Sequence, residues 1–209
     1  MREVIYGFDP LCGWCYGLIP AWRAVLAAQP DLLVDVVPGG LITGARIGPY
    51  AAAAGYIRQA SARMEAVTGQ RLGDAFFQLI EGDKSPVSAS APPSYALLQA
   101  PEDARLSYAH ALQEAHFARG ADLSQGAVLA EIARALGFEI DGAAAQGAKD
   151  DTPRVSAAFA RAKGLGISSF PTTLVVDQGD IVARVDGEYD PQRFTRAVLG
   201  ALNGDSHAD

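Results

Sequence analysis

Short apolar segments that are typical of β-strands lie near both ends of the chain. Residues 3–8 alternate weakly between apolar and polar positions and stop at an Asp-Pro pair, which predicts a strand followed by a turn. Residues 32–37 form a second apolar run, which a Pro-Gly-Gly sequence closes. Residues 172–176 and 181–185 are two further runs separated by a short polar turn, and they predict a β-hairpin.

A helical pattern connects the first two predicted strands. Apolar residues recur at helical spacing from Gly13 to Gln29, where Pro20 would bend the first turns and Pro30 ends the helix. A strand, a helix and a second strand in this order predict a βαβ unit with parallel strands. At the other end of the chain, Asp190-Pro191 starts a last helix that runs through Leu202, and a polar tail follows.

The middle of the chain has a different pattern, which predicts an inserted helical domain. Residues 48–164 are rich in alanine and show helical periodicity without a convincing strand, so residues 1–47 and 165–209 would form the other domain. Serine and proline between residues 84 and 93 indicate a loop. The expected helices of the insert, many of them ending at glycine, are residues 50–68, 72–81, 93–99, 102–119, 124–136 and 153–163.

Composition narrows the classes of partner and the compartment. Apolar residues make up 49% of the chain, which is enough for a core, and the formal net charge of -7 argues against nucleic acid or an anionic membrane as a partner. No apolar run approaches the roughly 18 residues of a membrane span, and the first strand begins without a basic and apolar leader. With two cysteines and no disulfide framework, we expect a cytoplasmic protein.

The two cysteines, Cys12 and Cys15, form a C-x-x-C at the junction between the first strand and the first helix. Two intervening residues let both sulfurs meet at one helical turn, and the partial positive charge of a helix N-terminus favours a thiolate on Cys12. This placement predicts thiol–disulfide exchange. One alternative is a pair of inert buried thiols. Another is a zinc site, whose further ligands would come from His110, His116 and His207, none of them spaced as in a zinc finger.

The combination of this C-x-x-C with Ser168-Ser169-Phe170-Pro171-Thr172-Thr173 before the hairpin resembles the thioredoxin superfamily. The chain is most similar to the DsbA-like branch, in which a helical domain interrupts a thioredoxin fold. Within that branch, Phe8-Asp9-Pro10-Leu11-Cys12-Gly13-Trp14-Cys15-Tyr16-Gly17 is similar to the cytoplasmic FrnE-like predicted disulfide isomerases. The resemblance spans nearly the whole chain and implies an α/β fold: a thioredoxin fold with an inserted all-helical domain.

The resemblance implies roles for five residues. Cys12, the more exposed cysteine, would be the nucleophile that forms a mixed disulfide, and Cys15 would be the resolving thiol. Pro171 matches the family's cis-proline, which would approach the dithiol and help to present an extended substrate, with Phe170 and Thr172 beside that surface. The alternative for Pro171 is an ordinary trans proline at the start of a strand.

Residues beside the cysteines bear on the expected chemistry, and two of them, Asp9 and Trp14, have two interpretations each. Asp9 would relay a proton to or from Cys15, or would simply form a turn with the proline after it. Trp14 would shape the substrate surface, or would be an aromatic residue at a partly exposed helix start. The dipeptide Gly13-Trp14 supplies no cation for a Cys12 thiolate, so the sequence gives no reason to expect a strong oxidant.

We therefore expect a dithiol–disulfide oxidoreductase or protein disulfide isomerase that acts on a protein or small molecule containing a thiol or disulfide. The second hypothesis is a kappa-class glutathione transferase or chromene-carboxylate isomerase, but those relatives typically have serine where this chain has Cys12. The third is a redox-sensing binding module without catalysis. We expect no metal and no tightly bound cofactor, with glutathione as a candidate redox partner; a homodimer is left open, and His110 and His116, six residues apart, are interpreted as ordinary helix residues.

Overall fold

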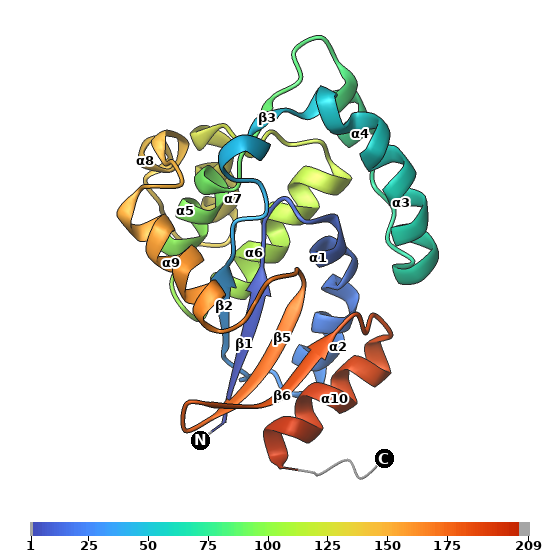
Figure 1. Cartoon of the computed structure of the whole chain (residues 1–209), viewed down its shortest axis with the longest axis vertical. Coiled ribbons are helices and arrows are strands. Elements are labelled where there is room, and N and C mark those ends of the chain that lie inside the picture. The colour runs from blue at the N-terminus through green and yellow to red at the C-terminus, as the bar shows by residue number, and fades with distance from the viewer. Residues whose placement is uncertain (1, 205–209) are drawn as a thin grey trace.

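The computed structural model describes residues 2–204, and its centre is a four-stranded sheet with helices on both faces (Figure 1). The strands are β1 (Glu3–Phe8), β2 (Val34–Pro38), β5 (Thr172–Asp177) and β6 (Asp180–Asp186), in the spatial order β2-β1-β5-β6. β1 is parallel to β2 and antiparallel to β5, and β5 is antiparallel to β6. The predicted βαβ unit and the predicted hairpin are both confirmed.

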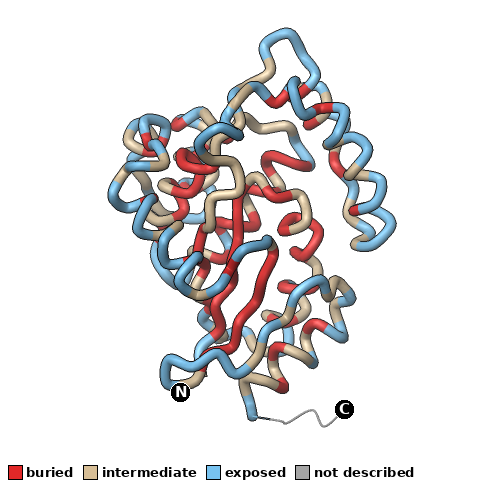
Figure 2. The backbone as a smooth tube through the Cα atoms, viewed as in Figure 1, coloured by how far each residue is buried: buried red, intermediate tan, exposed pale blue. Residues whose placement is uncertain are grey.

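Both faces of the inner strands are buried: in β1 every residue after Glu3 is buried, and in β5 every residue before Asp177 (Figure 2). On one face, Tyr6 and Phe8 belong to the core that α2 (Ile19–Ala28) and α10 (Pro191–Asn203) cover. On the other face, Ile5 belongs to a smaller core with α9 (Pro153–Gly164). The dithiol lies at the end of the sheet where β1 stops, because α1 (Gly13–Gly17) follows that strand.

The helix expected from Gly13 to Gln29 is two helices, so that prediction is wrong in one respect. The chain breaks at Leu18, between α1 and α2, and Pro20 lies in the first turn of α2. Proline has no amide proton to give to the preceding turn, so a new helix begins there in place of a bend within one helix. The break limits α1, which begins after Cys12 and contains Cys15, to five residues.

The insert is mainly helical, as expected, but its boundaries differ from the prediction. Its α-helices are α3 (Ala54–Thr68), α4 (Asp74–Glu81), α5 (Ala91–Gln99), α6 (Arg105–Gln113), α7 (Gly126–Ala135), α8 (Gly142–Gly147) and α9, with a 3-10 turn at Tyr50–Ala53 and another, Gly44–Arg46, just before the insert. The helix expected at residues 102–119 changes after Gln113 into a π-helical segment, Glu114–Ala118. The sequence pattern missed α8, a short helix of glycine, alanine and one glutamine.

The expectation that the insert lacks strands is wrong. β3 (Gly48–Pro49) and β4 (Val87–Ser88) form a two-residue antiparallel pair at the base of the α3–α4 arm. A pair of this length is too short for an alternating pattern to be visible in the sequence. β4 lies within residues 84–93, which were expected to be entirely loop, and α5 also begins inside that stretch, at Ala91.

One hydrophobic core joins the insert to the sheet. Leu106 and Leu112 of α6 and Leu129 of α7 belong to the same buried cluster as Val34 and Val36 of β2. The division into residues 1–47 with 165–209 and residues 48–164 stays a prediction. Within residues 2–204, no helix combines the length and the apolar character that crossing a membrane requires.

Candidate active site

The two cysteines lie in one helical turn after β1. Cys12 is the N-cap residue of α1, and its carbonyl oxygen accepts hydrogen bonds from the amides of Cys15, at 3.1 Å, and Tyr16, at 3.2 Å. Both thiols are free. Cys12 is 5% exposed and Cys15 is fully buried, so Cys12 is the thiol that a substrate reaches first.

The segment before β5 meets the dithiol from the far end of the chain. The Phe170–Pro171 peptide bond is cis, as the resemblance implied. The Cys12 thiol donates a hydrogen bond to the Phe170 carbonyl oxygen at 3.4 Å. The structure therefore brings together Cys12, Phe170 and Pro171, while the role of Pro171 in presenting a substrate stays a prediction.

The two neighbours of Pro171 differ in their surroundings. The Phe170 ring is half-buried and lies so close to Gly39 that a Cβ atom there would be 2.1 Å from the ring. Thr172 is fully buried, and its hydroxyl donates a hydrogen bond to the Ser169 carbonyl oxygen at 2.9 Å. Of the two side chains that were expected beside the substrate surface, only Phe170 is partly exposed.

Asp9 is fully buried and stabilises the turn between β1 and α1. One carboxylate oxygen accepts hydrogen bonds from the Leu11 amide at 2.9 Å and the Ser90 hydroxyl at 3.1 Å, and the other accepts one from the Leu41 amide at 2.7 Å. Burial raises the pKa of the Asp9 carboxyl, and the hydrogen bonds from Leu41, Leu11 and Ser90 partly offset that rise. The turn role is visible in these contacts, and the proton-relay role stays a prediction.

Gln113 is a site residue that the sequence analysis missed. It lies at the end of α6, is fully buried, and its amide nitrogen donates hydrogen bonds to the carbonyl oxygens of Asp9, at 3.2 Å, and Cys12, at 3.0 Å. The insert thus holds both ends of the turn from Asp9 to Cys12. The available signal was one polar residue a turn after His110 on the same helix, which by itself does not identify a partner.

An aromatic pair forms one side of the dithiol. Trp14 contacts Tyr189, from the loop between β6 and α10, with ring centroids 5.4 Å apart. Burial raises the pKa of Tyr189, and the nearby Cys15 and Cys12 thiols raise it further. On the other side, Met64 of α3 lies 3.6 Å from the position that a Cβ atom on Gly13 would take. Tyr189 has no sequence signal beyond being an aromatic residue in a turn.

The surroundings of Cys15 disfavour its thiolate form. Burial raises the pKa of Cys15 well above that of a free thiol, and the neighbouring Cys12 raises it further. A thiol with this environment is a poor first nucleophile, but it is placed to attack a disulfide that forms on Cys12. The arrangement suits a two-step exchange in which the second step requires help with the Cys15 proton.

The two described histidines, His110 and His116, are buried in the insert, three residues before and three residues after Gln113. The His116 ring accepts a hydrogen bond from the Tyr50 hydroxyl at 2.9 Å and donates one to the Ala121 carbonyl oxygen at 2.8 Å. In residues 2–204, no group of three or more His, Cys, Asp or Glu side chains is arranged to hold a metal ion. His207, the remaining zinc candidate, lies outside the described residues.

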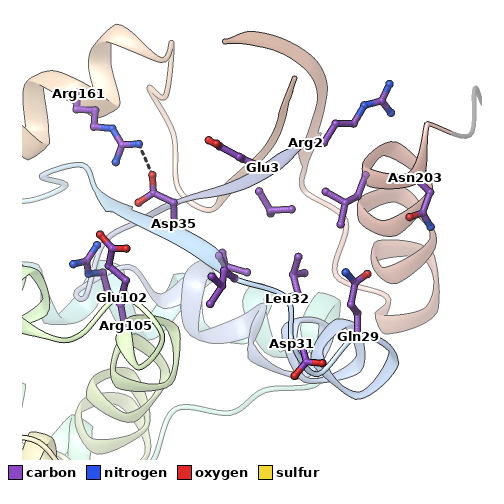
Figure 3. A pocket seen from close by; sticks show the side chains of 14 residues that line it. Arg2, Glu3, Gln29, Asp31, Leu32, Asp35, Glu102, Arg105, Arg161 and Asn203 are labelled. Atoms are coloured by element: carbon purple, nitrogen blue, oxygen red, sulfur yellow. Dashed lines mark hydrogen bonds and ion pairs between the residues drawn. The ribbon is translucent and has the colours of Figure 1, made fainter. Parts of the chain in front are cut away.

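A hollow of about 790 Å³ lies at the opposite end of the sheet, near the start of β1 (Figure 3). Its lining mixes both signs of charge, and Arg161 pairs there with Asp35. Arg2 pairs with Asp177 at 3.2 Å. Arg2 and Arg161 thus have acidic partners, whereas Arg105, which also lines the hollow, donates a hydrogen bond to the Ala100 carbonyl oxygen at 3.3 Å.

The sheet topology, the interrupting helices and the C-x-x-C beside a cis-proline define a DsbA-like thioredoxin fold. Residues 3–198 match the DSBA-like thioredoxin domain, and the chain belongs to this family. No curated protein matches the chain.

Solved structures agree with this assignment. The cytosolic disulfide reductase DsbM from Pseudomonas aeruginosa is similar with a TM-score of 0.80 and 28% identity over 96% of this chain and 98% of that chain. DsbM with GSH gives a TM-score of 0.77 and 27% identity over 96% and 99%. A proposed protein disulfide isomerase from Nitrosomonas europaea shares the fold, with a TM-score of 0.75 and 20% identity over 98% of both chains.

Proposed function

We propose that this protein is a thiol–disulfide oxidoreductase that acts through a mixed disulfide on Cys12. The observation that carries the proposal is the slightly exposed Cys12 thiol between a buried Cys15 and the cis peptide bond of Pro171. The Cys12 thiolate attacks one sulfur of a substrate disulfide, and the other sulfur leaves as a thiolate that takes up a proton. The Cys15 thiolate then attacks Cys12 Sγ, the substrate's second sulfur leaves, and two electrons have passed to the substrate.

We further propose that the exchange runs toward reduction or isomerisation, with glutathione as the redox partner and a protein or small-molecule disulfide as the substrate. Gly13 and Trp14 give the Cys12 thiolate no cationic partner, so one common cause of a strongly oxidising dithiol is absent from the dipeptide. The similar DsbM is described as a cytosolic disulfide reductase and has been seen with GSH. A cytoplasmic location and membership of the FrnE-like subgroup belong to the same proposal.

Insulin reduction with a glutathione regenerating system tests the exchange. We expect Cys12→Ser to abolish turnover and Cys15→Ser to accumulate a mixed disulfide on Cys12, which mass spectrometry detects. A Ser61→Ala variant is a suitable control, because that hydroxyl is on α3 and bonds only to the Arg58 carbonyl oxygen of its own helix. Full turnover by Cys12→Ser would contradict the proposal.

Titration with reduced glutathione separates this proposal from a glutathione transferase. The 2-hydroxychromene-2-carboxylate isomerase has the same fold, with a TM-score of 0.58 and 15% identity over 96% of both chains. A transferase would bind reduced glutathione tightly and form no covalent adduct with reduced or oxidised glutathione, whereas in a Cys15→Ser variant the oxidoreductase forms a lasting Cys12 adduct with oxidised glutathione and releases one molecule of reduced glutathione. Tight binding together with no adduct would favour the transferase.

A further inference from the structure

Three buried polar atoms without a hydrogen-bond partner among the described residues occur in the core around Cys15: Tyr6 Oη, Trp22 Nε1 and Thr173 Oγ1. Tyr6 of β1 lies directly opposite Thr173 of β5 in the antiparallel pair, so both side chains point to the same face of the sheet. The Tyr6 ring lies 5.1 Å from the Trp22 ring, and Tyr6, Trp22 and Cys15 belong to one buried cluster.

A hydroxyl in this position is costly for the folded protein if it only fills space. An unpaired buried hydroxyl loses its bonds to water, and phenylalanine would fill the same volume without that loss. The fully buried Tyr6 hydroxyl therefore gains from any acceptor within its reach, and, besides burial, a hydrogen bond to the neighbouring Cys15 is among the causes that raise the pKa of Tyr6. A thiolate on Cys15 is such an acceptor, because it accepts hydrogen bonds far better than a thiol does.

The other groups that face Cys15 do not fill this role. The titratable groups around the Cys15 thiol are Cys12, Asp9, Tyr6 and Tyr189. Both carboxylate oxygens of Asp9 already accept hydrogen bonds, and a carboxylate repels a thiolate. Burial raises the pKa of Tyr6, and the neighbouring Cys15 and Cys12 raise it further, so the Tyr6 phenol keeps its proton and remains a donor.

We propose that Tyr6 is a positioning residue whose hydroxyl donates a hydrogen bond to Cys15 Sγ as the thiolate forms in the resolving step. The inference rests on the proposed function. The Cys15 proton leaves to solvent, the Cys15 thiolate attacks Cys12 Sγ, and the bond between Cys12 Sγ and the substrate sulfur breaks. The phenol does not transfer its proton; its hydrogen bond stabilises the negative charge on Cys15 until the new disulfide has formed.

The two steps are separable with the aromatic disulfide DTNB in stopped-flow absorbance. When the reduced protein is mixed with equimolar DTNB, Cys12 attacks the reagent and releases a first thionitrobenzoate at a rate that depends on the concentrations of protein and DTNB. Cys15 then attacks within the same molecule and releases the second thionitrobenzoate at a rate that is independent of those concentrations. We expect Tyr6→Phe to leave the first phase within twofold, to slow the second by roughly tenfold, and to shift the pH midpoint of the second phase upward.

A matched control is Tyr108→Phe. Tyr108 is also fully buried, but its hydroxyl bonds to the Leu129 carbonyl oxygen at 2.8 Å in the insert. This variant should lose stability and keep both phases. An unchanged second phase in folded Tyr6→Phe would overturn the inference alone, whereas a wild-type protein that releases no second thionitrobenzoate would overturn the proposed function.

A second variant keeps the test informative if Tyr6→Phe does not fold. Replacement of Tyr6 by 3-fluorotyrosine through site-specific incorporation retains the shape and the hydroxyl but makes the phenol a stronger donor. The second phase should then become faster at a given pH and its midpoint should move to lower pH. A folded 3-fluorotyrosine protein with an unchanged pH profile would contradict the proposed hydrogen bond.

Discussion

At the scale of single residues, Gln113 is the side chain through which the insert holds the active-site turn. Gln113→Leu would remove the hydrogen bonds to the Asp9 and Cys12 carbonyl oxygens while filling a similar volume. Each bond contributes about 1 kcal/mol, so we expect a loss of about 2 kcal/mol in the free energy of unfolding, measured in urea. Gln99→Leu is the control, because Gln99 also makes two backbone bonds, to Asp141, but at an exposed position.

If Gln113→Leu and Gln99→Leu lower the free energy of unfolding by the same amount, the buried hydrogen bonds of Gln113 stabilise the protein no more than the hydrogen bonds of Gln99 do. A further readout is the rate at which Cys12 reacts with DTNB, which depends on the position of the turn. This rate should change in Gln113→Leu and stay constant in Gln99→Leu.

Gly39 is the residue that makes room for Phe170 beside the cis-proline. In Gly39→Ala the new Cβ would lie 2.1 Å from the Phe170 ring, so the ring has to move, and with it the carbonyl that accepts the Cys12 hydrogen bond. We expect a loss of about 1–3 kcal/mol in stability and slower insulin reduction. Phe170→Leu in the Gly39→Ala background should recover part of the stability, and additive effects in this double-mutant cycle would contradict the contact.

Sequence analysis identified the residues of reactive or ionisable type at the candidate site and missed the residues that contact them. Cys12, Cys15 and Asp9 are reactive or ionisable types next to a recognisable junction, so local pattern locates them. Gln113 and Tyr6 acquire their importance only from contacts across the fold. Their neighbours depend on how the insert and the sheet meet, which no local pattern encodes.

At the scale of elements, the contact between α7 and α8 depends on two glycines. Gly126 of α7 and Gly142 of α8 approach so closely that a Cβ atom on Gly126 would lie 2.0 Å from the Gly142 carbonyl oxygen. Since that obstacle is backbone, Gly126→Ala should force the helices apart and lower the free energy of unfolding by about 1–3 kcal/mol. Gly147→Ala, also in α8 but with open space around it, should be neutral or slightly stabilising in the same urea titration.

The elements that escaped sequence analysis share a physical cause. α8 and the β3–β4 pair are too short to show a period, and they form because neighbours pack against them or pair with them. The π-helical segment after Gln113 likewise has no local signal. The strands of the sheet were found correctly because each contains a run of apolar, mostly β-branched residues bounded by turn residues, which is a local signal.

At the scale of the whole molecule, burial of two histidines makes stability depend on pH. Burial lowers the pKa of His116 to about 4 and, helped by Arg23, that of His110 to about 3, against about 6.5 in the unfolded chain. Below pH 6.5 the unfolded state binds protons that the folded state does not. Stability is therefore fully present above about pH 6.5 and falls as the pH drops toward 4, by about 1.4 kcal/mol per pH unit for each histidine.

Asp9 changes stability with pH in the opposite direction. Because its pKa is raised in the folded state, the folded protein binds that proton at a higher pH than the unfolded chain does, so this group adds stability as the pH falls. The pH dependence of the free energy of unfolding therefore contains contributions from several groups. Comparing wild type with a variant that lacks one histidine isolates the contribution of that histidine. We expect urea titrations between pH 4.5 and 6.5 to show that His110→Leu has a slope smaller than wild type by about 1.4 kcal/mol per pH unit. Equal slopes would mean that His110 is protonated in the folded protein, contrary to its burial in the core of the insert.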